Sequence, residues 1–374
     1  MSRTADPKLL DRPLRLQVLS GRTLELPLSR PLVTGAGTFD RRSLILVSAT
    51  VDCGGDRWVG YGEVAPLPGW SEETVDDSLH LLESLDVPRD LDSVNDLGRA
   101  MPELADRAVL HAGIELAVLD ALSRAAGQPL AQTLKGDRFG GISESVPVQY
   151  TLGALEIGET CRRVSEAAGA GYTVCKLKVG AASAREDLER VEAVLERCPG
   201  MRFRLDANGA WSVETAMAML RRLPAERVEL VEQPVDRKSF KRLLDAWDGQ
   251  GPGIAADESC VNRDDAMQCL EDGRVSALVI KPAALGGLLA ASRLIECALD
   301  SGVDVIISNL MESAVGRMAA AHLASAWPQL PGPHGLATGS WLARDLLDGG
   351  EQIVDARLQL PDGPGIGFDP VLER

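Results

Sequence analysis

Five short apolar segments, each ending in a charged residue, decide the fold of this sequence. They are VCKLK at 174–178, FRLD at 203–206, VELVE at 228–232, IAAD at 254–257 and ALVIK at 277–281. The charged residues at their ends are 24 to 28 residues apart, which is about the length of a strand, a loop and a helix together. The sequence therefore predicts a repeating β/α unit with a reactive side chain at the carboxyl end of each strand.

A closed repeat of this kind would bring all five charged side chains to one face. In a (β/α) barrel the carboxyl ends of the strands meet at the same mouth, which is where barrel enzymes carry their active sites. We therefore expect Lys178, Asp206, Glu232, Asp257 and Lys281 to surround a single site.

The length of the chain indicates more than a barrel. A barrel takes about 200 to 250 residues, which leaves over a hundred of the 374 for a second domain. Alternating strands between residues 14 and 62, followed by an apolar-periodic helix at 103–126, predict an α+β unit. We expect an α+β capping domain at 1–140, a barrel at 141–344 that starts with VPVQYTLG, and a tail at 345–374 that returns to the capping domain.

Charge and composition argue against several classes of partner. The formal net charge is −16, and the acidic residues are dispersed, so that nucleic acid and anionic membranes are disfavoured as partners. The seven cysteines form no CxxC pair, and no long apolar run or leader-like start is present. We expect a soluble, cytoplasmic protein with reduced thiols; homo-oligomer formation is left open.

The three acids and the lysines suit one kind of chemistry. Three carboxylates with no His or Cys nearby favour a hard cation, Mg²⁺ with Mn²⁺ as the alternative. Such an ion can hold a substrate carboxylate and neutralise the charge that develops when the adjacent carbon loses its proton. Only seven of the 39 basic residues are lysines, and three of these (Lys176, Lys178 and Lys281) lie at predicted strand ends, where an amine can act as a base.

The motifs around these charged residues resemble those of a known family. Lys176-Leu-Lys178, Asp206-Ala-Asn208, Glu232-Gln-Pro, Asp257-Glu-Ser and Lys281-Pro are similar in order and spacing to the muconate-lactonising subgroup of the enolase superfamily. Four further segments resemble the o-succinylbenzoate synthases: GYGE at 60–63, PLPG at 66–69, SNLMESAVG at 308–316 and HGLAT at 334–338. The resemblance implies a modified (β/α)8-type barrel of the form (β/α)7β, with Asp206, Glu232 and Asp257 as ligands of Mg²⁺.

The resemblance also implies roles for the lysines. Lys178 would be the general base that takes the proton α to a carboxylate, and Lys176, on the same face of the strand, would lower its pKa by charge. Lys281 would face the substrate from the other side of the mouth. It would serve either as a second acid/base or as a fixed cation that stabilises the enediolate, and spacing alone does not separate these roles.

Other residues are candidates for contact with the substrate. Asn208, Ser308, Asn309, Gly335 and Thr338 are expected to line the site, whereas His334 is not expected to be catalytic. Two loops, at 33–42 and 66–73, match in position the capping loops of the superfamily. Phe39 and Trp70 on these loops are candidates for apolar contact with a ring.

The activity that the resemblance implies is the removal of water from 2-succinyl-6-hydroxy-2,4-cyclohexadiene-1-carboxylate, which yields o-succinylbenzoate for menaquinone synthesis. N-succinylamino acid racemisation, dipeptide epimerisation and muconate cycloisomerisation use the same machinery and stay open. The eighth-strand segment GLATG lacks the Asp-x-Asp of dipeptide epimerases, which disfavours that branch. A metal-binding barrel without catalysis is the alternative from another class.

Overall fold

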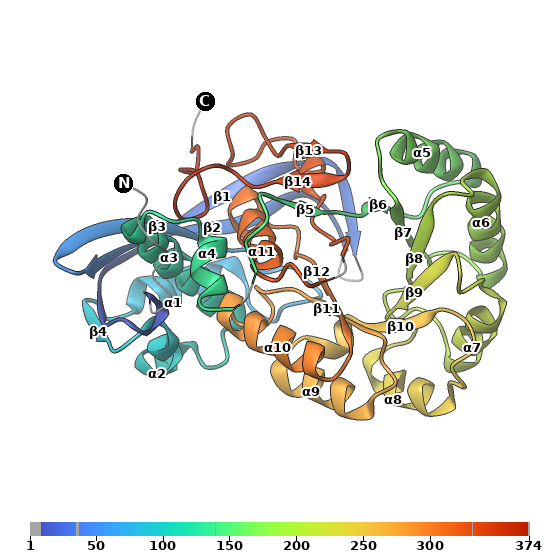
Figure 1. The fold of residues 1–374 in the computed structure, drawn as a ribbon, viewed down its shortest axis with the longest axis horizontal. Coiled ribbons are helices and arrows are strands. Elements are labelled where there is room, and N and C mark those ends of the chain that lie inside the picture. The colour runs from blue at the N-terminus through green and yellow to red at the C-terminus, as the bar shows by residue number, and fades with distance from the viewer. Residues whose placement is uncertain (1–8, 35–36, 139, 331, 373–374) are drawn as a thin grey trace.

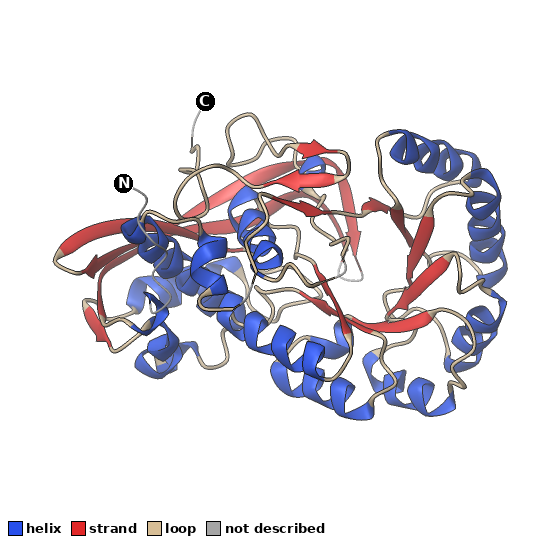
Figure 2. Ribbon diagram, in the orientation of Figure 1, coloured by secondary structure: helices blue, strands red, loops and turns tan. Residues whose placement is uncertain are grey.

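The computed structural model of the chain describes residues 9–34, 37–138, 140–330 and 332–372. An antiparallel sheet with helices forms one end of the molecule, and a curled parallel sheet with helices on its outer side forms the other (Figures 1 and 2). The predicted α+β unit and the predicted barrel are both present.

The N-terminal sheet has four antiparallel strands in the order β3-β2-β1-β4. Their bounds are Leu14–Thr34 (β1), Gly37–Cys53 (β2), Asp56–Val64 (β3) and Arg89–Leu91 (β4). The β1–β2 hairpin is long, because pairing continues to Thr34 opposite Gly37. Within the segment 33–42, expected to be a loop, residues 33–34 and 37–42 are therefore strand; Gly35 and Ala36 lie outside the described residues.

Helices cover one face of this sheet. Val75–Ser84 (α1) and Ala108–Ala126 (α3) pack directly against its strands, and Leu97–Ala100 (α2) contacts β4. Leu130–Lys135 (α4) packs against α3 and the barrel helix Ala314–Ala326 (α11). The long helix begins later than residue 103, because residues 102–104 form a separate 3₁₀ turn, and it ends at Gly127 in the left-handed conformation as expected. Its contact with β3 is so close that a Cβ at Gly62 would lie 1.9 Å from the carbonyl oxygen of Gly113. The GYGE motif thus contains a packing requirement, since only glycine leaves room for the helix backbone.

Seven parallel strands form the curled sheet, in the order β12-β11-β10-β9-β8-β7-β6. The strands are Tyr150–Leu152 (β6), Val174–Lys178 (β7), Arg202–Asp206 (β8), Val228–Glu232 (β9), Gly253–Ala256 (β10), Ala277–Ile280 (β11) and Asp304–Ile307 (β12). The helices between and after them are Ile157–Gly169 (α5), Ala184–Arg197 (α6), Val213–Arg222 (α7), Arg237–Ala246 (α8), Arg263–Asp272 (α9), Leu288–Asp300 (α10) and Ala314–Ala326 (α11). Figure 1 shows α5 to α10 following one another around the outside of the sheet.

A short eighth segment joins the two edges of this sheet. Gly335 pairs in parallel with Ser308, just after β12, and His334 pairs in parallel with Val148, just before β6. The backbone N–H of Gly335 donates to Ile307 and that of Gln149 donates to His334. The order of elements is therefore (β/α)7β, as the resemblance implied.

The tail lies against two parts of the molecule. Strands Ile353–Val354 (β13) and Arg357–Gln359 (β14) form an antiparallel sheet with Ser145–Pro147 (β5), so the first two residues of VPVQYTLG pair with the tail and the rest belongs to the barrel. Asp120 of α3 accepts a hydrogen bond from the N–H of Ile366, which ties the tail to the N-terminal helices. The domain boundaries near residues 140 and 344 stay predictions.

Two buried carboxylates from the N-terminal third cap helices of the barrel. Glu63 of β3 accepts hydrogen bonds from the backbone N–H groups of Ser313 and Gly316, at the start of α11. Glu115 of α3 accepts one from Leu289, at the start of α10. Because the first N–H groups of a helix lack partners within the helix and carry partial positive charge, these carboxylates fix the N-terminal third onto the mouth side of the barrel.

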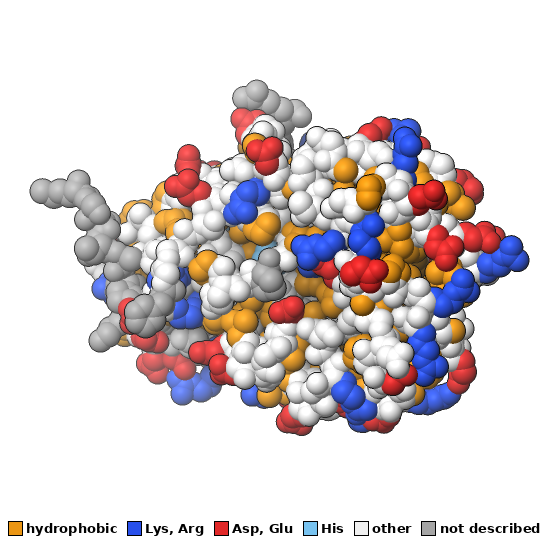
Figure 3. All heavy atoms as spheres, turned by 45° about the vertical axis from the view of Figure 1, so that its right-hand side comes forward, with side chains coloured by type: hydrophobic (Ala, Val, Ile, Leu, Met, Phe, Trp, Pro, Cys, Tyr) orange, Lys and Arg blue, Asp and Glu red, His pale blue; other side chains and the backbone are white. Residues whose placement is uncertain are grey.

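The surface agrees with the dispersed charge of the sequence. On the face shown in Figure 3, acidic and basic side chains are interspersed over the barrel half. No helix in the described part of the chain is both long enough and apolar enough to cross a lipid bilayer.

Candidate active site at the barrel mouth

The structure brings the predicted acids and lysines together at adjacent strand ends. Lys176 Nζ donates to Glu232 Oε1 at 2.6 Å and lies 2.8 Å from Asp206 Oδ2. Lys178 Nζ donates to the same Asp206 oxygen at 2.6 Å. Three strands, β7, β8 and β9, thus join in one ionic cluster.

The cluster is buried, and its charges act strongly on one another. Asp206 and Glu232 are at most 2% exposed, whereas the side chain of Lys178 is 36% exposed. Burial and the neighbouring charge of Asp206 raise the pKa of Glu232 above its ordinary value. Burial disfavours the ammonium of Lys176, but Asp206 and Glu232 outweigh this effect and raise its pKa. Lys176 is therefore a fixed cation beside the acids.

Lys281 lies on the far side of the three acids. Its Nζ donates to both oxygens of Asp257 at 2.7 Å and lies 3.4 Å from the centre of the Trp70 ring. Trp70 belongs to the loop at 66–73, so this loop reaches the barrel mouth, as the capping-loop hypothesis requires. The position of the ammonium over the ring face is that of a cation–π contact.

The chain turns sharply just after two of the acids. Asn208 has φ +43° and Gln233 has φ +38°, a conformation that residues other than glycine seldom adopt. The buried Gln233 side chain donates to Ser259 and accepts from the backbone N–H of Asp257 and Ser259, which links the segment after Glu232 to the segment around Asp257. Gln233 therefore fixes the relative position of two predicted metal ligands.

Asn208 connects Lys178 with a fourth acid. Its Oδ1 accepts from Lys178 Nζ at 2.6 Å, and its Nδ2 donates to Glu258 Oε1 at 3.0 Å. Glu258 Oε2 is buried and has no hydrogen-bond partner among the described residues. An oxygen atom next to the acid cluster is thus available as an acceptor.

Four predicted substrate-binding residues lie together between the seventh and eighth strands. Asn309 Nδ2 donates to Thr338 Oγ1 at 2.9 Å and to the carbonyl of Gly335 at 3.3 Å, while its Oδ1 accepts from the N–H of Met311. Ser308 Oγ is 3.4 Å from the carbonyl of Gly335. The Asn309 amide is thus engaged within the protein and holds this turn, and its direct contact with a substrate stays a prediction.

His334 is a buried residue that supports the backbone of the barrel. It is 2% exposed, and its Nδ1 accepts a hydrogen bond from the backbone N–H of Ile307. Burial, with a contribution from Arg204, lowers the pKa of His334 to about 3. A neutral imidazole that supports the seam of the barrel agrees with the expectation that His334 is not catalytic.

Arg42, for which the sequence indicated no role, joins both sides of the mouth. Its guanidinium is 3% exposed and donates to the carbonyls of Ala65, Pro66, Leu310 and Met311 at 2.9 to 3.3 Å. These carbonyls belong to the start of the Trp70 loop and to the segment after β12. The available signal was the position of Arg42, two residues before the buried apolar run that starts at Leu44. A guanidinium buried there needs several acceptors.

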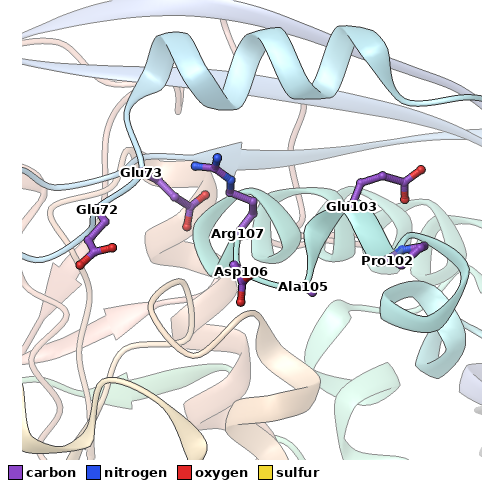
Figure 4. Close-up of a pocket in the computed structure, with 7 residues that line it drawn as sticks. All are labelled: Glu72, Glu73, Pro102, Glu103, Ala105, Asp106 and Arg107. Atoms are coloured by element: carbon purple, nitrogen blue, oxygen red, sulfur yellow. The ribbon is translucent and has the colours of Figure 1, made fainter.

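The other end of the Trp70 loop is also fixed. Glu73 accepts hydrogen bonds from the N–H groups of Val109 and Leu110, at the start of α3. Figure 4 shows Glu73 beside Arg107 at this helix terminus, on a cavity of about 430 Å³ that contains none of the predicted site residues. Only the middle of the loop, including Trp70, lies between the two anchored ends.

As they lie in the structure, the predicted acids and lysines do not form a metal-binding site. Among the residues that the structure describes, no three acidic, His or Cys side chains are arranged to hold one ion. The reason is visible in the contacts, because an ammonium is bound to each of the three predicted ligands. The donor set itself, three buried carboxylates with the unpartnered oxygen of Glu258 nearby, has the chemistry that a hard divalent cation requires.

With this geometry, the chain can be assigned to a class of proteins. It belongs to the enolase superfamily. Residues 157–374 match the family described as Enolase C-terminal domain-like, and residues 21–135 match the Mandelate racemase / muconate lactonizing enzyme, N-terminal domain.

Individual relatives in this family carry several activities. The chain is 28% identical to a chloromuconate cycloisomerase of Pseudomonas putida, with 95% of this chain and 96% of the relative covered. It is 30% identical to an N-succinylamino acid racemase of Thermus thermophilus, with 96% and 97% covered. It is 29% identical to an o-succinylbenzoate synthase of Geobacillus kaustophilus, with 93% and 92% covered.

A solved structure supports the same fold. A dipeptide epimerase of Enterococcus faecalis, complexed with Mg and the dipeptide L-Leu-L-Tyr, has a TM-score of 0.83 and 26% identity, with 94% of this chain and 99% of that chain covered. The predicted family and fold are thus confirmed, while the relatives differ in the reactions for which they are named.

Proposed function

We propose that this protein removes a proton α to a carboxylate in a magnesium-dependent reaction, and that its main activity is that of an o-succinylbenzoate synthase. The observation that carries the proposal is the arrangement of Lys178 and Lys281 on opposite sides of the buried acids Asp206, Glu232 and Asp257. Such an arrangement would put an amine on each side of a carboxylate bound at the acids.

The acids would hold the metal. Asp206, Glu232 and Asp257 supply three carboxylates, and Glu258 supplies a further oxygen that has no hydrogen-bond partner in the described part of the chain. Magnesium bound there would supply the positive charge that makes the α-proton of a carboxylate substrate acidic enough to be removed. Mn²⁺ fits the same oxygen donors.

Lys178 would move the proton. Among the three site lysines it has the most exposed side chain, and Asn208 and Asp206 hold its Nζ at the mouth. In its neutral form it would accept the α-proton; the resulting ammonium, on the same face of the substrate, would then protonate the departing hydroxide. The two steps together release one water molecule and leave an aromatic ring.

Lys176 and Lys281 would act mainly through charge. The pKa of Lys176 is raised by the acids that it contacts, so it stays an ammonium. Lys281, buried between Asp257 and the Trp70 ring, would place its positive charge on the opposite side of the substrate from Lys178. A preorganised charge in a buried site stabilises a developing anion more than the same charge does in water.

The carbon skeleton of the substrate is proposed from sequence similarity and from one local feature. The GYGE, PLPG, SNLMESAVG and HGLAT motifs resemble the synthases, and a synthase of Geobacillus kaustophilus is 29% identical over nearly the whole chain. The turn around Gly335 and Thr338 carries no acid pair for a free amine, which is unfavourable for a dipeptide. Trp70 over the mouth would suit an apolar ring.

N-succinylamino acid racemisation is the second candidate. A racemase of Thermus thermophilus is 30% identical to this chain. That reaction needs two bases on opposite faces of the α-carbon, and Lys178 and Lys281 are available for these roles.

One experiment decides between the two. The purified protein is assayed with 2-succinyl-6-hydroxy-2,4-cyclohexadiene-1-carboxylate, with N-succinylamino acids and with muconate, each with added Mg²⁺ and with a chelator. The proposal expects Mg²⁺-dependent dehydration with the highest kcat/KM. If succinylamino acid turnover exceeds dehydration by orders of magnitude, the synthase activity is rejected; no α-proton exchange on any substrate would leave only a scaffold role.

A further inference from the structure

We propose that residues of the N-terminal third, and not the barrel alone, set the position of the Lys281 ammonium, whereas Lys178 is positioned by barrel residues. This inference rests on the proposed function, because it assigns separate structural control to the two amines. Its consequence is that a change in the N-terminal third should impair proton transfer on one face of the substrate only.

The first contact lies above the ammonium. The Trp70 ring, on the loop anchored by Arg42 and Glu73, lies 3.4 Å from Lys281 Nζ. The ring therefore limits the directions in which the lysine side chain can swing away from Asp257.

The second contact holds the segment that follows Lys281. From α3, His111 Nδ1 lies 2.6 Å from the carbonyl oxygen of Gly286, and Glu115 Oε1 accepts from the N–H of Leu289. Both residues lie on the same face of α3, one turn apart. The N–H of Ala284 also donates to the carbonyl of Lys281, which fixes the start of the segment 281–289.

The barrel side of this contact is shaped to receive the carboxylate. Gly287 has φ +134°, and a Cβ at this position would lie 2.2 Å from Glu115 Oε1. Glu115 is 3% exposed, so the contact excludes water. The segment from Lys281 to Leu289 is thus fitted closely to α3.

Lys178 is held differently. Its Nζ contacts Asp206 and Asn208, and its backbone carbonyl accepts from Arg190 of α6 at 2.6 Å. These partners all belong to the barrel, and none of the described residues of the N-terminal third (9–34 and 37–138) forms a hydrogen bond or ion pair with the Lys178 side chain. The two amines therefore depend on different parts of the chain.

The test compares proton exchange at the two faces of one substrate type. The magnesium-loaded, full-length enzyme is incubated in D₂O with each enantiomer of an N-succinylamino acid, and loss of the α-proton signal is followed by NMR. Each enantiomer presents its proton to one of the two lysines, so the ratio of the two rates compares Lys281 with Lys178. Because both rates come from the same folded protein, partial misfolding of a variant cancels in the ratio.

The variants are Gly287→Ala, Glu115→Ala and Trp70→Leu, with Trp70→Phe as the conservative change. Since a displacement of about 1 Å can cost 10²-fold in rate, we expect the relative rate at the Lys281 face to fall about tenfold or more in the first three, with recovery in Trp70→Phe. Arg190→Lys, on the Lys178 side, should change the ratio in the opposite direction. An unchanged ratio in Gly287→Ala and Glu115→Ala overturns the proposal, as does a fall at the same face in Arg190→Lys.

Crystal structures of the magnesium-loaded wild type and Gly287→Ala give a second readout that does not need turnover. A shift of Lys281 Nζ by about 1 Å or more, with Lys178 Nζ in place, supports the proposal, and an unmoved Lys281 overturns it. If wild type exchanges only one enantiomer, the proposal is decided by these structures. If wild type exchanges neither enantiomer and does not dehydrate the cyclohexadiene, the proposed function fails, and the structures still decide the present inference.

Discussion

Lys178 on β7 and Asp206 on β8 touch across neighbouring strands, with Nζ and Oδ2 2.6 Å apart. The amine proposed as the base therefore lies directly beside an acid proposed as a metal ligand. Lys178→Ala should lower α-proton exchange and dehydration by about 10² to 10⁴-fold, because the positioned base is lost. Exchange is measured by NMR in D₂O; magnesium affinity should be kept.

Lys241→Ala is the matched control for this change. The side chain of Lys241 is 65% exposed and pairs with Asp245 on α8, away from the mouth. Its removal should leave exchange within twofold of wild type. Equal losses in both variants would contradict a role for Lys178 in proton transfer.

Removal of a metal ligand should be seen in binding as well as in activity. Asp206→Asn or Glu232→Gln should abolish the stabilisation of the fold by magnesium, which is about 2.7 kcal/mol at a hundredfold excess over Kd. Thermal unfolding with and without Mg²⁺ measures this effect. Asp264→Asn, whose side chain is 89% exposed, should respond to magnesium as wild type does. A chelator should stop turnover of the wild type, and added Mg²⁺ should restore it.

Replacement of Arg42 should reduce stability and activity far more than replacement of its neighbour Arg41. Arg42→Met leaves the carbonyls of Ala65, Pro66 and Leu310 without their buried donor, which should cost about 3 kcal/mol of stability and lower kcat/KM by loosening the Trp70 loop. Arg41→Met removes a guanidinium that is 61% exposed and should have little effect. Denaturant unfolding and steady-state kinetics on both variants check this; similar losses would show that the mouth does not depend on the buried guanidinium.

The close approach of β3 to α3 predicts a steric effect of one methyl group. Gly62→Ala places a Cβ 1.9 Å from the carbonyl oxygen of Gly113 and should destabilise the fold by about 3 kcal/mol or prevent its formation. Gly158→Ala, in α5 with open space around the added methyl, should be neutral or stabilising by up to about 1 kcal/mol. The two melting temperatures provide the comparison, and a harmless Gly62→Ala would mean that the helix can move away from the sheet.

His322 should make stability depend on pH in the acid range. Burial lowers the pKa of His322 to about 4, against an ordinary value near 6.5, so between these values the unfolded chain binds more protons than the folded protein. The stability contributed by the neutral imidazole is therefore complete above about pH 6.5 and is lost as the pH falls towards 4, by about 3 kcal/mol in total. The difference in unfolding free energy between wild type and His322→Gln should shrink across this window and be flat above it.

Much of the fold was predictable because its signals are local and periodic. Five of the seven described barrel strands, β7 to β11, end in or are directly followed by a charged residue, and the gaps between these residues match one β/α unit. Lys178, Asp206 and Glu232 could therefore be placed at one mouth from the sequence. The family motifs added the order of the elements. The end of α3 at Gly127 was also readable from a single residue.

Other features depend on contacts between distant segments and carry no periodic signal. Arg42 finds its acceptors more than twenty and more than two hundred and sixty residues away along the chain. The start of VPVQYTLG reads as a barrel strand but pairs with β14 instead, because the pairing partner is chosen by the tail. Likewise, the hydrogen bonds of the Asn309 amide to Met311, Gly335 and Thr338 join segments that the sequence does not link, and contact of Asn309 with a substrate stays a prediction.

The barrel is closed by a segment near the end of the chain, and this affects how the chain folds during synthesis on the ribosome. The acids at the ends of β8 and β9 and directly after β10 are translated well before His334 and Gly335. The hydrogen bonds of His334 and Gly335 to Gln149 and Ile307 join the first strand of the barrel to the seventh. At about 5 to 20 residues per second, the nascent sheet must wait several seconds with two unpaired edges. The open sheet is therefore the stage at which a chaperone, or an unwanted strand from a neighbouring chain, would find backbone groups to bind.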